Sequence, residues 1–91
     1  MRITVSVPSL LRDCTGGNVT FDLEAHTLQD AMDELFVIYP MLRVHLFTEA
    51  GQIRKHVLLY YNDTNLAWLD HFDHVLQPGD QLIVFQAVSG G

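Results

Sequence analysis

One apolar segment near the end of the chain constrains the fold more than any other feature. The segment from Leu82 to Val88 contains a single polar residue, Gln86. A strand without polar alternation is typical of a central position in a sheet, where both faces are largely covered. The preceding residues must therefore supply neighbouring strands and a covering layer, and 91 residues provide one small domain for them.

Two strands are predicted at the start of the chain. Residues 3–7 and residues 19–23 each alternate apolar and polar side chains, which is typical of a half-buried strand. The connection between them ends at Gly16-Gly17 and reads as a loop. Because the two strands are close in sequence, we expect an antiparallel hairpin.

The second half of the chain predicts further strands. A third strand spans residues 56–61 and stops at Asn62-Asp63. Residues 66–69 indicate a short helical turn or a minor strand. The turn Gln77-Pro78-Gly79-Asp80 then leads into the last strand, Gln81 to Val88.

A single amphipathic helix is predicted between the second and third strands. Thr27 suits the N-cap, Asp30 suits the positive end of the helix dipole, and Pro40 marks the end. Residues 41–55 are expected to be irregular. The apolar residues recur at helical spacing along one stripe, namely Leu28, Ala31, Met32, Leu35, Phe36 and Tyr39.

This order of elements predicts an α+β domain with a ubiquitin-like β-grasp fold. We expect a mixed sheet of four to five strands with one main helix packed across it, and the last strand at its centre beside the first. Residues 1–88 would form the domain, and residues 89–91, Ser-Gly-Gly, a flexible tail. Glycine has no Cβ, so such a tail fits a channel too narrow for side chains.

Composition excludes several classes of function. The formal charge is −6, and the five Lys and Arg residues form no basic cluster, so nucleic-acid binding is not expected. An acidic surface instead favours a basic protein partner. No apolar run approaches the length of a membrane span, and the start of the chain lacks the apolar core of a secretory signal. The single cysteine excludes an internal disulfide. We expect a cytoplasmic protein without membrane partners.

The turn Gln77-Pro78-Gly79-Asp80, the ending Val88-Ser89-Gly90-Gly91 and the element order together resemble the β-grasp sulfur-carrier family. That family includes the small subunit of molybdopterin synthase, the thiamine-biosynthesis sulfur carrier and the carrier that serves a cysteine synthase. The likeness covers nearly the whole chain. Many members carry prolines just before the valine of the tail, where this chain has Gln86-Ala87.

Two further stretches look most like the cysteine-biosynthetic and archaeal members. One is Pro8 to Arg12 followed by Thr15-Gly16-Gly17. The other is Gly51 to Arg54, which leads into a strand that ends in Asn62-Asp63.

The resemblance implies a carrier without catalytic groups of its own. A partner enzyme of the ubiquitin-activating type would use ATP-Mg to adenylate the Gly91 carboxylate. A sulfur donor would convert the adenylate to a thiocarboxylate, which a sulfur-accepting synthase would use in the biosynthesis of cysteine, molybdopterin, thiamine or a related product. Gly90 and Gly91 would enter the channel of the partner, with Ser89 and Val88 at its mouth. No cofactor is expected on the carrier itself.

A ubiquitin-like protein modifier is the alternative from a different class. The same adenylate would then be joined to lysines of target proteins through Gly91. Lys55 is the only lysine of the chain, which disfavours extensive chains built through this protein. Phe85, Ala87 and Leu59 are candidates for partner docking near the root of the tail, although periodicity does not tell which of them face outward and which belong to the core.

Other residues with chemical potential have simpler interpretations. His71 and His74, with Asp70 and Asp73 beside them, would be able to share a metal on a helical turn, but no further ligand stands close in sequence, so we expect a solvated polar surface and no metal site. Asp13 would raise the pKa of Cys14 and lower its reactivity.

The remaining candidates are assigned structural roles. Trp68 is expected to plug one end of the core. Asp30, Asp33 and Glu34 are expected on the solvated side of the helix.

Overall fold

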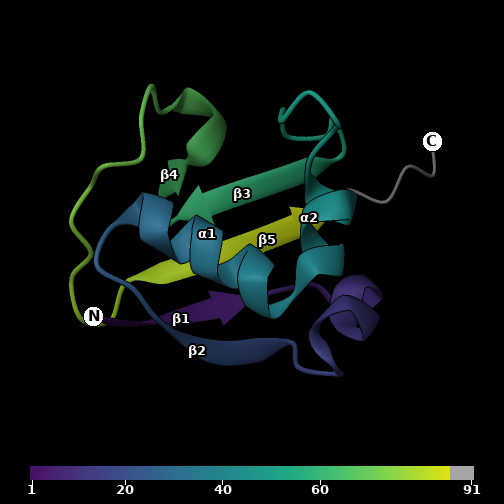
Figure 1. The fold of residues 1–91 in the computed structure, drawn as a ribbon, viewed down its shortest axis with the longest axis horizontal. Helices are drawn as coiled ribbons and strands as arrows, with labels where there is room; N and C mark the ends of the chain where they lie inside the picture. Colours follow the sequence, from purple (N-terminus) through teal and green to yellow (C-terminus); the bar gives the residue numbers. More distant parts are fainter. Residues whose placement is uncertain (87–91) are drawn as a thin grey trace.

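Five strands form one mixed sheet in the order β2-β1-β5-β3-β4 (Figure 1). The computed structural model describes residues 1–86. Strand β1 runs antiparallel to β2 and parallel to β5, and β3 runs antiparallel to both β5 and β4. The predicted β-grasp architecture and the central place of the last strand beside the first are thus confirmed. The strands are β1 (Arg2–Ser6), β2 (Thr20–Glu24), β3 (Val57–Tyr61), β4 (Thr64–Asn65) and β5 (Gln81–Gln86).

Helix α1 (Leu28–Ile38) lies across one face of the sheet (Figure 1). Its start is a capping box: the Thr27 hydroxyl accepts from the N–H of Asp30 at 3.1 Å, and the Asp30 carboxylate accepts from the N–H of Thr27. The predicted apolar stripe faces the sheet, and its first four members are buried. No helix within residues 1–86 has the length and apolar character to cross a bilayer.

A second helix, α2 (Pro40–Leu46), occupies part of the segment that was expected to be irregular. Pro40 ends α1 as predicted, but it also opens α2, because proline at the first helical position loses no intrahelical hydrogen bond. Leu42 and Leu46, four residues apart on one side of α2, are fully buried. Seven residues contain too few periodic positions for this helix to be recognised from sequence.

The loop expected before β2 contains a 3-10 helix, η1 (Ser9–Thr15), whose Leu11 and Thr15 are buried. A second one, η2 (Leu66–Trp68), follows β4, so the helical turn forms there and not the minor strand that was the other expectation. Trp68 does not plug the core: 74% of its surface is exposed. In a single three-residue turn Leu66 takes the buried place, which directs a side chain two positions later away from the core.

One face of the sheet is covered by helices and the other is exposed to solvent. Leu82 and Val84 of β5 point toward α1 and are buried, as are Ile3, Val5 and Leu59 of the neighbouring strands. On the opposite face of β5, Phe85 is 49% exposed. Both faces of the last strand were expected to be largely covered, so this expectation holds for one face only, because both helices lie on the same side.

Candidate functional site

The predicted reactive end of the chain follows β5. Gly91, its neighbours Gly90, Ser89 and Val88, and the docking candidate Ala87 lie outside the described residues, so their roles stay predictions. The structure does describe the strand that leads to them. Strand β5 pairs with β1 from Gln81 to Ile83 and with β3 from Leu82 to Gln86, and the pairing with β3 fixes the position from which the following residues depart.

An apolar surface lies on the uncovered face of the sheet, along the last part of β5. We call it the outer patch, and it consists of Leu58, Tyr60, Ile83 and Phe85. The antiparallel register places Leu58 opposite Phe85 and Tyr60 opposite Ile83. The rings of Tyr60 and Phe85 meet edge to face, with centroids 5.7 Å apart. Such cross-strand and aromatic pairs keep the surface ordered without a covering layer.

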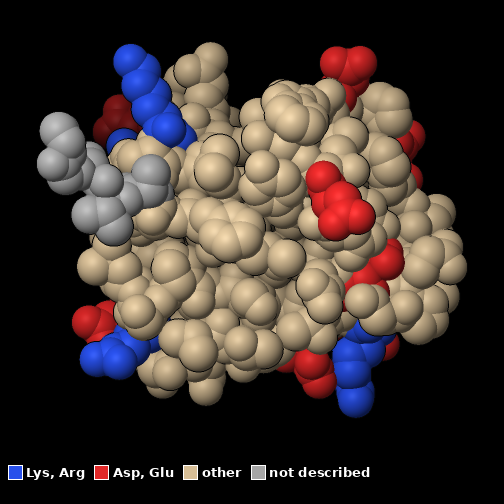
Figure 2. All heavy atoms as spheres, turned by 180° about the vertical axis from the view of Figure 1, so that it is seen from behind, with Lys and Arg blue, Asp and Glu red and all other residues tan. Residues whose placement is uncertain are grey.

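The outer patch is apolar where it is exposed and polar at its border. Leu58 is 42% exposed and Phe85 49%, whereas Tyr60 and Ile83 are half-buried. Figure 2 shows a wide uncharged area on this face, with Lys and Arg side chains at its margins and several acidic side chains toward the right of the view. On the β1–β2 side of the same sheet, Arg2 lies 3.9 Å from Glu24 in a surface ion pair. An uncharged surface with a polar rim is typical of a protein-docking site.

The structure corrects one docking candidate. Leu59 is 3% exposed and belongs to the core, so it does not present a surface to a partner. Its neighbour Leu58 does, because consecutive side chains of a strand point to opposite faces. Phe85 lies on the outward face, as a docking residue requires. Leu58, Tyr60 and Ile83 were missed because β3 and β5 are apolar on both faces, so the sequence pattern does not tell which side chains face outward. The pairing of β3 with β5 shows which residues share the outer face.

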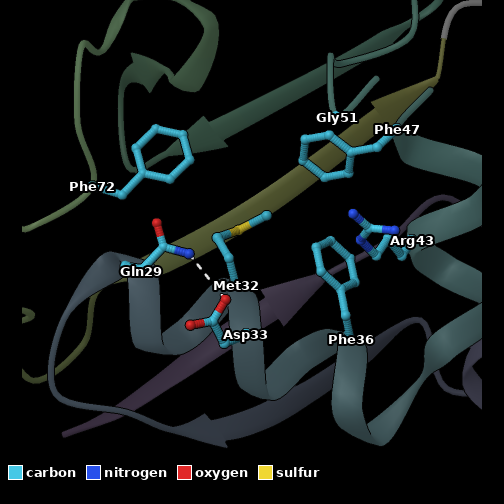
Figure 3. A pocket seen from close by; sticks show the side chains of 8 residues that line it. All are labelled: Gln29, Met32, Asp33, Phe36, Arg43, Phe47, Gly51 and Phe72. Carbon is cyan, nitrogen blue, oxygen red and sulfur yellow. Dashed lines mark hydrogen bonds between the residues drawn. The ribbon is translucent and has the colours of Figure 1, made fainter. Parts of the chain in front are cut away.

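A hollow lies on the helix side of the molecule, with a volume of about 190 Å³. Figure 3 shows the side chains of Met32, Phe36 and Phe47 around it, and Phe72 facing it from the connection before β5. Phe36 and Phe47 meet edge to face at 5.5 Å. Asp33, at the rim, accepts a 2.9 Å hydrogen bond from the Gln29 side chain. This hollow is separated from the outer patch by the sheet itself.

A polar cluster fixes the start of β5. Asp80, in the predicted turn, accepts hydrogen bonds from the N–H of Gln77 at 2.8 Å and from the Asn62 amide at 3.2 Å. Asn62 in turn accepts from the N–H of Gln81 at 2.9 Å. Gly79 provides the positive φ of +88° that the turn requires. The turn and the Asn62-Asp63 strand ending, which resemble the same family separately, are therefore parts of one contact.

The other candidates occupy the surroundings expected for them. Cys14 is half-buried, and burial followed by the charge of Asp13 raises its pKa, which keeps the thiol protonated at neutral pH. Asp30, Asp33 and Glu34 are exposed on α1.

The histidine-rich connection agrees with its expectation only in part. His71, Asp73 and His74 are exposed as expected, but the structure brings their ligand atoms together. They lie in the connection between η2 and β5, at the end of the sheet away from the end of β5 (Figure 1).

A sulfur carrier protein and, in fold alone, a small archaeal modifier protein are among the known proteins to which this chain is similar. The model of the ThiS family matches residues 5–91. The sulfur carrier protein CysO of Mycobacterium tuberculosis is 28% identical over 93 aligned positions, which cover all of both chains.

Two solved structures align over almost their whole length. The crystal structure of the BexX/CysO complex of Amycolatopsis orientalis has a TM-score of 0.78 at 26% identity, and the match covers 98% of this chain and 99% of that one. The crystal structure of SAMP1 from Haloferax volcanii covers both chains fully, with a TM-score of 0.76 at 23% identity, and it shows the fold alone.

Proposed function

This chain belongs to the ThiS family, and from that premise we propose that it is a sulfur carrier loaded at the carboxylate of Gly91. A partner enzyme of the ubiquitin-activating type adenylates this carboxylate with ATP-Mg. A sulfur donor then displaces AMP and leaves a thiocarboxylate, which a sulfur-accepting synthase consumes. The observation that carries the proposal is the full-length match to a sulfur carrier protein, which extends through the glycine pair.

The proposed chemistry explains why activation is needed. A carboxylate is a poor electrophile because it is anionic and has no good leaving group. The acyl-adenylate supplies AMP as the leaving group, so that a sulfide nucleophile attacks the carbonyl carbon and the C–O bond to AMP breaks. The product is a soft, terminal sulfur nucleophile. The carrier contributes the acyl group, and its partners contribute the nucleotide site and the catalytic groups.

The geometry of the described residues supports this division of labour. Strand β5 is the central strand, so a partner that holds the domain also fixes where residues 87–91 start. The outer patch offers apolar area beside that point, and Phe85 at its exposed end precedes Gln86, the last residue of β5. We propose that the adenylating enzyme and the sulfur-accepting synthase both dock on the outer patch, in the cytoplasm, where neither a bound cofactor nor a membrane is needed. The BexX/CysO complex is an assembly of a similar protein with a second protein, which supports the expectation of a protein partner.

Intact-mass spectrometry tests the proposal directly. The purified chain would be incubated with the adenylating enzyme of the same organism, ATP-Mg and a sulfide source. A sulfur carrier shows a new species in which one oxygen has been exchanged for sulfur. A variant that lacks Gly91, and a variant with one residue appended after it, serve as controls and should show none.

The same experiment discriminates the alternative. If the chain is a protein modifier, the thiocarboxylate stays absent and Gly-Gly remnants appear on lysines of other proteins when cell extract is supplied. An adenylate that forms but is never converted to either product contradicts the sulfur-carrier proposal.

A further inference from the structure

Three side chains with metal-ligating atoms converge in the connection between η2 and β5. One nitrogen from each of His71 and His74 and one carboxylate oxygen of Asp73 all lie within 4.8 Å of one another. Nδ1 of His71 is in direct contact with Oδ1 of Asp73. The two imidazole rings are stacked, with centroids 5.7 Å apart and an angle of 25° between their planes.

The backbone that carries these side chains is held against the start of α1. The N–H of Leu28 donates to the carbonyl of His74 at 2.9 Å, and the N–H of Gln29 donates to the carbonyl of Phe72 at 2.8 Å. The first N–H groups of a helix have no partner within the helix, so this segment satisfies two of them. The residues on both sides of Asp73 are thereby fixed, and the ligand atoms are not brought together by a freely moving loop.

The side chains of this segment divide between interior and solvent. Phe72 points toward the hollow beside Met32 (Figure 3), whereas its neighbours His71 and Asp73 are exposed, with side chains 69% and 79% accessible. The ring of His74 lies 6.2 Å from the ring of Tyr61 on the neighbouring β3. The anchored Phe72 therefore presents His71 and Asp73 together on the outside.

We propose that His71, Asp73 and His74 form a binding site for a divalent transition-metal ion of the Zn²⁺ class. Imidazole nitrogens together with a carboxylate oxygen are ligands that Zn²⁺ takes in tetrahedral sites, and imidazole also suits Ni²⁺ and Cu²⁺. Bonds of about 2.0–2.2 Å place the ligand atoms of a tetrahedral site roughly 3.3 Å apart. The exposed side chains reach that separation by small rotations, and water occupies the fourth position.

This inference revises the expectation of a plain solvated surface. That expectation rested on the absence of a further ligand close in sequence, and a shared metal was considered only for a helical turn, where His71 and His74 are three residues apart. The segment is not helical, and the alternation of exposed and half-buried residues puts His71 and Asp73 on one side. The site is independent of the proposed sulfur chemistry, because it lies at the opposite end of the sheet from the end of β5 (Figure 1).

Isothermal titration of the full chain with Zn²⁺ tests the site. We expect one ion bound per chain, and we expect His71→Ala, His74→Ala and Asp73→Asn each to weaken the binding by about tenfold or more. His56→Ala is the matched control, since His56 is an exposed histidine in the turn before β3, and it should leave the dissociation constant unchanged. A chain without Gly91 should bind Zn²⁺ as the complete chain does, which separates this site from the sulfur-carrier function.

Thermal unfolding provides a second readout. An ion that binds only the folded chain raises the melting temperature by mass action, so at the same Zn²⁺ concentration the rise should be equal in the wild type and the His56→Ala variant and smaller in His74→Ala. The proposal is overturned if the wild type binds no Zn²⁺, if His71→Ala and His74→Ala bind it as tightly as the wild type, or if His56→Ala weakens binding as much as they do.

Discussion

The hydroxyl of Tyr61 donates a 2.5 Å hydrogen bond to Oδ2 of Asp80, which joins the end of β3 to the turn that starts β5. Burial alone would raise the pKa of Asp80, but the hydrogen bonds from Tyr61, the Gln77 N–H and the Asn62 amide outweigh it and lower that pKa. Burial, with the hydrogen bond and charge of Asp80, raises the pKa of Tyr61 to about 12. At neutral pH the pair is therefore a protonated donor and an ionised acceptor.

Removal of the Asp80 carboxylate should destabilise the domain more than removal of the Tyr61 hydroxyl. Asp80→Ala leaves three donors without an acceptor in a mostly buried place, so we expect a loss of about 3 kcal/mol in the free energy of unfolding. Tyr61→Phe removes one charge-assisted hydrogen bond, with an expected loss of about 1.5 kcal/mol. Urea denaturation followed by circular dichroism measures both. Tyr60→Phe, one residue away on the outer face, is the control and should stay within about 0.5 kcal/mol of the wild type.

The lowered pKa of Asp80 predicts a specific dependence of stability on pH. A carboxyl group whose pKa is lower in the folded state stabilises the fold above its unfolded pKa, about 3.9, and loses that contribution as the pH falls through the folded pKa. We therefore expect the difference in unfolding free energy between the wild type and Asp80→Asn to be constant near neutral pH and to shrink in acid. Denaturation series between about pH 7 and pH 3 measure it. A difference that grows in acid contradicts this assignment.

The outer patch should matter to partner binding and not to folding. Phe85 is a half-exposed aromatic residue at the end of the outer patch nearest the end of β5, and aromatic residues are enriched among those that contribute most to docking energies. We expect Phe85→Ala to weaken the binding of the adenylating enzyme by about tenfold, equivalent to about 1.4 kcal/mol. Titration of the partner by calorimetry measures the change.

Trp68→Ala is the matched control for this experiment. Trp68 is another exposed aromatic residue, 74% accessible, but it lies on η2, outside the outer patch. Its removal should leave partner binding unchanged. Equal losses in the two variants, or no loss in Phe85→Ala, contradict docking on the outer patch.

How far the sequence predicts this molecule depends on the length and regularity of each segment. Helix α1 was predicted because its apolar stripe and the Thr27 cap agree over three turns. Helix α2 was missed because Pro40 reads as a stop when only one helix is considered, whereas burial of Leu42 and Leu46 against the rest of the fold stabilises a seven-residue helix. Such short helices depend on tertiary contacts that local propensity does not contain.

The candidate site was only half predictable for a related reason. The tail motif and the Pro-Gly-Asp turn are local patterns, so the chain itself displays them. The assignment of Leu59 to the docking surface failed because β3 is apolar on both faces, and only its pairing with β5 decides which residue is outside. The convergence of His71, Asp73 and His74 likewise depends on where the start of α1 holds the connection.

The unpredicted helix α2 should contribute substantially to stability. Leu42 is fully buried, so Leu42→Ala removes buried methyl groups and leaves a cavity, with an expected loss of about 2–5 kcal/mol in the free energy of unfolding. Val44→Ala on the same helix is the control, since Val44 is 56% exposed, and it should change stability by less than about 0.5 kcal/mol. Guanidinium denaturation of both variants measures the contrast, and similar values for the two would mean that α2 is not packed as described.

Loss of Gly91 should separate function from folding. All buried apolar residues within the described part of the chain lie between Ile3 and Val84, so removal of a residue beyond β5 takes no described side chain out of the core. We expect deletion of Gly91 to abolish formation of the thiocarboxylate, because Gly90 then presents the carboxylate one residue too early for the adenylating site. The free energy of unfolding should stay within about 0.5 kcal/mol of the wild type. Denaturation and intact mass are measured on the same preparation, and a fall in stability similar to that of Leu42→Ala would show that the end of the chain is part of the packed domain.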